Sequence, residues 1–97
     1  MIQSFADEGT EDTFNGRNCK AARRTCPREL WGTAARMLDH LDSVEELEHL
    51  RIPPGNRLEA LTGDRKGQYS IRINERYRIC FRWSMLGPLD VEIVDYH

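Results

Sequence analysis

The sequence predicts an α+β fold in which a small, twisted, antiparallel-dominated sheet packs on two or three N-terminal helices. Two observations predict it. Apolar residues recur at spacings of three and four in the first half of the chain, as in helices, and alternate with polar residues after residue 56, as in half-buried strands. With 97 residues the chain has room for one core, so we expect a single domain covering residues 1–97.

The N-terminal segment carries the weaker signals. Residues 1–5 alternate between apolar and polar and favour a short strand. Residues 7–15 begin with acidic side chains and end before Gly16, which favours a short helix, poorly anchored because Phe14 is almost its only large apolar residue. Residues 18–26 are basic and lack apolar periodicity, so we expect a loop there.

The strongest helical signal begins at Pro27, a residue suited to the first turn of a helix. Its apolar stripe is formed by Leu30, Ala34, Met37, Leu38 and Leu41. Ser43 and Glu46 match a capping box, which predicts a second, shorter helix that ends at the Pro-Pro-Gly-Asn of residues 53–56.

Beyond residue 56 the period changes to two, which predicts an antiparallel meander. A hairpin loop is expected at residues 62–68 and a turn at Gly87-Pro88. The expected strands cover residues 57–61, 69–74, 77–83 and 91–96.

Basic charge is concentrated in one segment although the net charge of the chain is -2. Residues 57–82 hold seven Lys or Arg against three Asp or Glu. Because side chains alternate across a strand, Arg72, Arg78 and Arg82 are expected on the face that the helices do not cover. Two explanations remain open: a polyanionic ligand, or cross-strand neutralisation by Glu59 or Glu92.

Several classes of protein and site are disfavoured. No apolar run is long enough to span a membrane, and the first eight residues are not those of a signal peptide, so we expect a cytoplasmic protein with no membrane partner. Cys19, Cys26 and Cys80 are expected to be free thiols, because their spacing fits no zinc or redox motif. His40 and His49 are expected to be solvated. We expect neither a metal nor a cofactor.

A set of motifs covers the second half of the chain densely. It consists of Pro53-Pro54-Gly55-Asn56-Arg57-Leu58, Leu61-x-Gly63-Asp64-Arg65-x-Gly67, Tyr69-Ser70-Ile71-Arg72-Ile73-Asn74, Tyr77-Arg78-Ile79-Cys80-Phe81 and Glu92-Ile93-Val94-Asp95-Tyr96-His97. With Met1-Ile2-x-Ser4-Phe5 at the start, this pattern closely resembles the HigB killer proteins, which belong to the RelE-like toxins of bacterial toxin–antitoxin systems. The match is loose between residues 6 and 30.

The resemblance implies a RelE-like fold and a ribosome-dependent mRNA endoribonuclease. It implies as partners the ribosome, mRNA and a helix-turn-helix antitoxin of the HigA type, with DNA contacted only through the antitoxin. Metal-independent cleavage by 2′-hydroxyl attack needs a base, an acid and a cation for the charge that builds on the phosphate.

The candidate catalytic residues follow from those three roles. We assign Arg78 to the scissile phosphate, His97 and Tyr96 to proton transfer, and Asp95 to orienting them. Some members of the family carry a catalytic His where this sequence has Glu59. A carboxylate among arginines is a poorer proton acceptor, so we expect slower cleavage than in those relatives.

The candidate RNA-binding residues are basic side chains around that centre. Arg72, together with Arg65 or Lys66, is expected to position flanking phosphates, and Arg76 and Arg82 complete the set. Two other functions remain open: a non-catalytic RNA-binding module that blocks the ribosome, and an interaction domain whose arginines bind an acidic protein.

Overall fold

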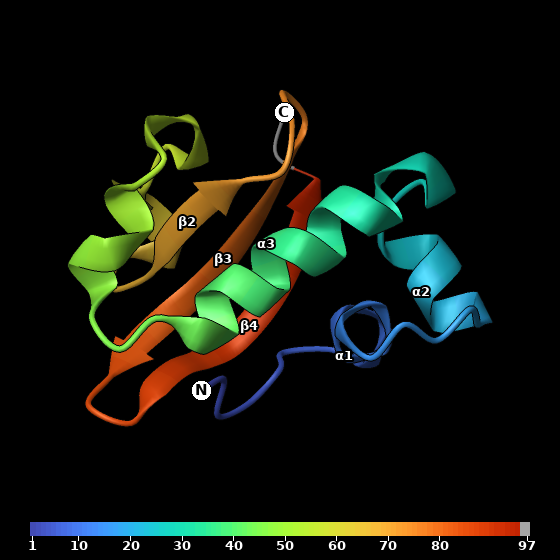
Figure 1. Cartoon of the computed structure of the whole chain (residues 1–97), viewed down its shortest axis with the longest axis horizontal. Coiled ribbons are helices and arrows are strands. Elements are labelled where there is room, and N and C mark those ends of the chain that lie inside the picture. Colours follow the sequence, from blue (N-terminus) through green and yellow to red (C-terminus); the bar gives the residue numbers. More distant parts are fainter. Residues whose placement is uncertain (96–97) are drawn as a thin grey trace.

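A computed structural model describes residues 1–95 of the chain and shows three α-helices and a four-stranded sheet (Figure 1). The helices are α1 (Glu8–Phe14), α2 (Lys20–Thr25) and α3 (Trp31–Ser43), and the strands are β1 (Glu59–Ala60), β2 (Tyr69–Arg72), β3 (Tyr77–Ser84) and β4 (Gly87–Asp95). Short 3-10 turns lie at Arg28–Leu30, Leu47–Arg51, Pro54–Asn56 and Gly63–Arg65. The predicted α+β class is confirmed.

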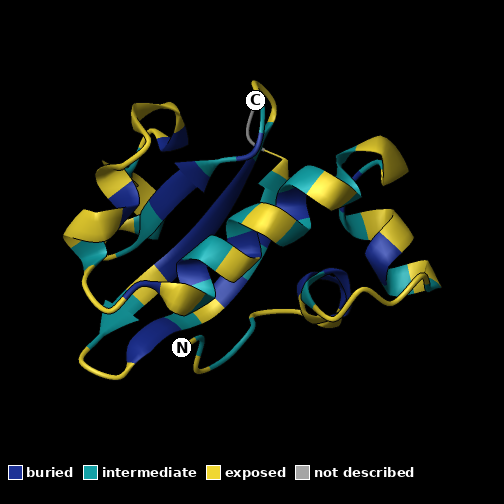
Figure 2. Ribbon diagram, viewed as in Figure 1, coloured by how far each residue is buried: buried dark blue, intermediate teal, exposed yellow. Residues whose placement is uncertain are grey.

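The sheet has the strand order β1-β2-β3-β4, and each neighbouring pair is antiparallel. Helix α3 crosses one face of it, while α1 and α2 lie beyond β4 (Figure 1). Buried residues line the inner stripe of α3 and the strand surface beneath it (Figure 2). The sheet is therefore covered on one face by a helix, as the predicted packing of a sheet on N-terminal helices requires.

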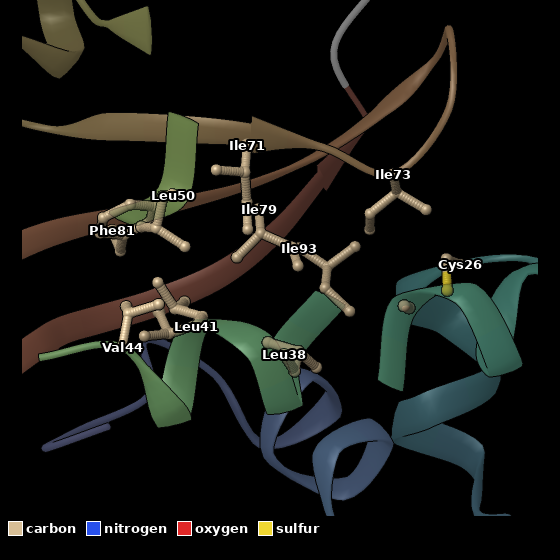
Figure 3. Close-up of a cluster of buried hydrophobic side chains, with 12 residues drawn as sticks. Cys26, Leu38, Leu41, Val44, Leu50, Ile71, Ile73, Ile79, Phe81 and Ile93 are labelled. Carbon is tan, nitrogen blue, oxygen red and sulfur yellow. The ribbon is translucent and has the colours of Figure 1, made fainter. Parts of the chain in front are cut away.

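The core forms where the stripe of α3 meets the sheet (Figure 3). Leu38 and Leu41 of α3 are fully buried and face Ile71, Ile79 and Ile93 of the strands. The apolar spacing of three and four predicted this helix correctly, because such spacing places side chains on a single face. Leu50 also enters the core, from the turn at Leu47–Arg51.

The predicted loop at residues 18–26 is wrong, because most of it is helix α2. Ala22 is fully buried against the neighbouring elements. A Cβ at Gly9 of α1 would collide with the Ala21 carbonyl and the Thr25 hydroxyl of α2. Close helix packing through small residues holds α2 in place, and such packing leaves no apolar stripe to be read in the sequence.

Helix α1 is short, as predicted, but it is not poorly anchored. Its cap is the Asp7 carboxylate, which accepts a hydrogen bond from the Thr10 amide at 2.7 Å. The fully buried Thr10 hydroxyl accepts a hydrogen bond from the Ile93 amide at 3.0 Å, which ties α1 to the edge of β4. These polar contacts anchor α1 together with Phe14, which packs against the core and against the ring of Phe5.

The predicted second helix after Ser43 is also wrong. Ser43 is the last residue of α3, and its hydroxyl donates to the His40 carbonyl instead of capping a new helix. Val44 adopts an extended backbone, and only a 3-10 turn at Leu47–Arg51 follows. With this break in the helix, both Val44 and Leu50 reach the core.

Residues 1–5 form an isolated parallel bridge instead of the predicted strand. Phe5 pairs with Val91, and the Gln3 amide donates to the Pro88 carbonyl at 2.8 Å. The segment runs beside β4 and covers part of its edge. The bridge stays short because the Ala6 amide makes a last hydrogen bond to the Val91 carbonyl and Asp7 then caps α1, which begins at Glu8.

The strand limits and the last turn differ from the prediction. Residues 57–61 contribute only the two-residue β1, and β2 ends at Arg72 because the Asn74 side chain accepts hydrogen bonds from the next turn. Gly87 begins β4, so the chain reverses at Met85 and Leu86. A Cβ at Gly87 would collide with the Met1 carbonyl, which explains glycine there.

Candidate functional site

The strands present a polar surface on the side that faces away from α3. In the sheet register Glu59 pairs with Ser70, Ser70 with Cys80, Cys80 with Glu92, and Arg72 with Arg78. Register partners lie on the same face of a sheet. We call the surface formed by these six residues, Glu59, Ser70, Arg72, Arg78, Cys80 and Glu92, the open face.

Arg78 lies at the centre of the open face and is held on several sides. Only 9% of the residue is exposed. Its Nε donates to the Ser70 hydroxyl at 2.7 Å, and its Nη2 donates to the Arg57 carbonyl at 2.7 Å. The Glu59 carboxylate lies 3.9 Å from the same Nη2. The guanidinium thus has a defined orientation.

The acceptor at Arg57 belongs to a turn with an unusual backbone. Arg57 has φ 49° and ψ 55°, in the left-handed region that side chains other than glycine rarely adopt. The buried Asn56 amide holds the preceding segment by donating to the Leu50 and Ile52 carbonyls at 3.1 and 3.4 Å. This turn brings a backbone acceptor from outside the sheet to Arg78.

Five arginines in and around the open face also meet a carboxylate. The ion pairs are Arg65–Glu92 at 3.2 Å, Arg72–Glu75 at 4.0 Å, Arg76–Asp95 at 2.7 Å, Arg78–Glu59 at 3.9 Å and Arg82–Asp90 at 3.7 Å. Glu59 and Glu92 therefore both neutralise basic side chains, as the second explanation expected. The explanation by a polyanionic ligand also keeps its support, because Arg72 and Arg78 lie directly opposite each other.

The hairpin between β1 and β2 places further basic residues at this surface. Arg65 reaches over the sheet and bonds to Gln68 and Glu92 at 3.1 and 3.2 Å, while Lys66 beside it is exposed. Arg82 lies beside Gly67, where an added Cβ would come within 3.1 Å of its Nη1. The hairpin and the sheet thus form one continuous basic and acidic surface.

Asp95 contacts Arg76 through two hydrogen bonds. Its carboxylate accepts from Nε at 2.8 Å and from Nη2 at 2.7 Å. The pKa of the Arg76 guanidinium is raised above its usual value, chiefly by this hydrogen bond and then by the charge of Asp95. The expected partners of Asp95, Tyr96 and His97, lie outside the described residues.

The cysteines are free, and two of them are buried. Burial raises the pKa of the Cys80 thiol on the open face, which disfavours a nucleophilic thiolate. Burial, with a smaller effect from the charge of Glu29, raises the pKa of Cys26 from 9.0 to about 11. Among residues 1–95, no group of three or more His, Cys, Asp or Glu is placed to hold a metal ion.

The two histidines differ from each other in their surroundings. His49 is exposed, and its Nε2 lies 3.3 Å from Glu46. His40 is half-buried, and its Nε2 is buried with no hydrogen-bond partner in the described part of the chain. The expectation that His40 is solvated is therefore wrong. Within residues 1–95, no helix has the length and apolar character needed to cross a membrane.

Two parts of the site were not predicted from sequence. Strand alternation places Ser70 on the face of Arg72, but only the register shows that it meets Arg78. The Arg57 carbonyl carries no side-chain signal at all, since it depends on the path of the turn.

Comparisons with known proteins agree with one another. Residues 3–97 match the family described as "RelE-like toxin of type II toxin-antitoxin system HigB". The chain is 45% identical over 83 residues to Toxin HigB-1 of Vibrio cholerae serotype O1, covering 86% of this chain and 84% of the relative. It is 39% identical over 57 residues to an uncharacterized protein of Haemophilus influenzae, covering 59% and 56% of the two chains.

A solved structure shares the fold at low sequence identity. A chain of the YoeB-YefM complex from Staphylococcus aureus superposes with a TM-score of 0.57 at 14% identity, covering 100% of this chain and 98% of that one. The RelE-like arrangement of sheet and helices is thus confirmed.

Proposed function

Because the chain belongs to the HigB family of RelE-like toxins of type II toxin–antitoxin systems, we propose that it is a ribosome-dependent mRNA endoribonuclease that stops translation and growth. The observation that carries the proposal is the fixed guanidinium of Arg78, placed opposite Arg72 on the sheet face that points away from α3. Guanidinium groups hold phosphates through paired hydrogen bonds and keep their charge at any physiological pH.

The proposed reaction is attack by the ribose 2′-hydroxyl on the adjacent phosphorus. The 2′ oxygen bonds to phosphorus as the bond to the 5′ oxygen breaks, which yields a 2′,3′-cyclic phosphate and a 5′-hydroxyl. One proton leaves the 2′-hydroxyl for a base, and an acid supplies another to the 5′ oxygen. Negative charge grows on the phosphate in between, where Arg78 would stabilise it.

The remaining roles are assigned to Glu59 and to the last three residues of the sequence, and Asp95 among these is paired in register with Tyr77 rather than with Arg78. Glu59 is a candidate base, since its side chain is 56% exposed and lies beside Arg78. Tyr96 and His97 come directly after Asp95 in the sequence, and we assign them proton transfer. Asp95 would orient them.

The basic rim would bind the message on either side of the cut. Arg65, Lys66 and Arg72 are proposed to hold flanking phosphates, with Arg76 and Arg82 at the periphery. Each of these arginines forms an ion pair with a carboxylate, so an RNA phosphate must replace that carboxylate as its partner. Binding is therefore expected to depend strongly on salt.

The toxin family implies an antitoxin partner, and we propose one of the HigA helix-turn-helix type. Contact with DNA would occur only through that antitoxin. Action on the ribosome and its mRNA would place the protein in the bacterial cytoplasm.

The proposal is tested by inducing the wild type and a Tyr96→Phe, His97→Ala double variant in bacteria and mapping new RNA 5′ ends. His49→Ala is the matched control, because it removes an exposed histidine paired with Glu46 on the helical side. We expect growth arrest and new in-frame ends with the wild type and the control, and neither with the double variant. Arrest by all three proteins without new ends would replace the nuclease with a non-catalytic inhibitor that blocks the ribosome.

A further inference from the structure

We infer that Ser70, together with the turn at Asn56 and Arg57, is a positioning device that sets the orientation of Arg78 toward the scissile phosphate. The inference rests on the proposed function and assigns a role to residues that touch neither RNA nor the reacting atoms.

The position of Arg78 is unfavourable for stability by itself. An arginine side chain that is only 11% exposed loses most of its water, and that loss is costly unless hydrogen bonds replace it. Arg72 lies directly opposite, and like charges in register on neighbouring strands repel each other. A purely structural sheet would place an apolar or neutral residue here. The arginine and its surroundings therefore point to a use other than stability.

The contacts around Arg78 fix its direction as well as replacing water. Ser70 is fully buried, so its hydroxyl accepts the Nε hydrogen bond without competition from solvent. The Arg57 carbonyl accepts a hydrogen bond from Nη2 and approaches from a second direction, outside the sheet. Two acceptors on different nitrogens define the plane of a guanidinium, whereas one acceptor leaves it free to rotate.

The turn that supplies the second acceptor is itself constrained. Arg57 occupies the left-handed region, and the Asn56 side chain pins the backbone just before it through two carbonyl contacts. Non-glycine residues in that region persist where the surrounding structure holds them. The strained residue, Arg57, is thus the one whose carbonyl accepts the hydrogen bond from Arg78.

Loss of the Ser70 hydroxyl has a definite consequence. The Nε–H of Arg78 would be left without this acceptor, and the guanidinium would be drawn toward Glu59, which lies 3.9 Å from Nη2. A tighter ion pair with Glu59 would hold both groups away from the substrate. Misplacement by about 1 Å can slow a reaction by about a hundredfold.

The test measures cleavage of ribosome-bound mRNA by the full-length wild type, Ser70→Ala, Ser70→Thr and Arg78→Lys, and by the Ser70→Ala, Arg78→Lys double variant. Ser84→Ala is the matched control, because Ser84 is a half-buried serine of the same sheet that pairs with β4 and has hydrogen bonds to Gly87 and Leu86. We expect Ser70→Ala to lower kcat about ten- to a hundredfold with KM little changed, and Ser70→Thr to restore most of it.

The double variant separates positioning from a general effect on the fold. Lysine lacks the Nε–H group that donates to Ser70. Ser70→Ala should therefore lower kcat little further when Arg78 is already replaced by lysine. An activity-independent readout is the Nε–H resonance of Arg78 in nitrogen-15 spectra. It should exchange slowly with water in the wild type, Ser70→Thr and Ser84→Ala, and rapidly in Ser70→Ala.

Three outcomes overturn the inference. The first is a Ser70→Ala variant with the kcat of the wild type. The second is a double variant whose loss of kcat is the full product of the two single losses. The third is an Nε–H resonance of Arg78 that exchanges as slowly in Ser70→Ala as in the wild type. If the wild type itself fails to cleave, the proposed function fails and the inference falls with it. An active wild type with an unaffected Ser70→Ala variant removes this inference alone.

Discussion

Arg72 lies directly opposite Arg78 in the antiparallel register of β2 and β3. Two guanidinium-bearing side chains therefore leave the sheet side by side on the face away from α3. Their repulsion works against folding, and an RNA backbone would relieve it. A substitution that removes one of the two charges should therefore change the stability of the protein and its affinity for RNA in opposite directions.

Neutralising Arg72 should stabilise the protein and weaken its binding to RNA. We expect Arg72→Gln to raise the free energy of unfolding by about 0.2–0.5 kcal/mol at low salt, since it removes a like charge opposite Arg78. The gain should shrink at high salt, where such charges are screened. Urea unfolding measures it, with Arg36→Gln on the exposed side of α3 as control. A loss of stability in Arg72→Gln would contradict the argument.

Removing Glu92 should have the opposite effect on binding. Its carboxylate holds Arg65 at 3.2 Å, so Glu92→Gln releases a basic side chain for phosphate. We expect tighter binding to a single-stranded RNA and a log–log salt slope steeper by about 0.7. Fluorescence anisotropy over a salt series checks this. Glu48→Gln, which breaks the exposed pair with Arg51, should leave both quantities unchanged.

The packing of α1 on α2 should tolerate no side chain at Gly9. Gly9→Ala places a Cβ against the Ala21 carbonyl and the Thr25 hydroxyl, and we expect a loss of about 1–3 kcal/mol in unfolding free energy. At Gly32 of α3 nothing lies within 4 Å of the added Cβ. Gly32→Ala should therefore raise stability by about 0.5 kcal/mol. Equal effects of the two substitutions would refute the close contact.

The buried thiol of Cys26 should make stability fall at alkaline pH. Its pKa is raised from 9.0 to about 11 in the folded protein, so the unfolded chain loses this proton first. The contribution to stability is complete below pH 9 and is lost as the pH rises from 9 to 11, with a slope of at most about 1.4 kcal/mol per pH unit.

Urea unfolding of the wild type and Cys26→Ala over an alkaline pH series measures this contribution. The two stability curves should run parallel below pH 8 and converge above pH 9. Cys26→Ala removes a side chain that is 3% exposed, so its curve should start lower. Parallel curves up to pH 11 would show that Cys26 does not titrate as described.

Sequence patterns predicted the elements that have a strong period. The stripe of α3 and the alternation of β2, β3 and β4 are local patterns, and both were confirmed. Helix α2 was missed because its contact with α1 uses small residues, and a glycine against an alanine leaves no periodic signal. The break after Ser43 was missed because burial of Val44 and Leu50 outweighed the local capping pattern.

The candidate site divides in the same way. Alternation alone placed Arg72 and Arg78 on one face, and the family motifs pointed to the chain end. By itself the sequence thus determined the class of fold, the family and which side chains leave the covered face. The tertiary structure decided which groups hold Arg78, since the Ser70 contact depends on strand register and the Arg57 contact on a turn. The first joins residues eight apart across a hairpin and the second joins residues 21 apart, and no local period of two or 3.6 encodes either contact.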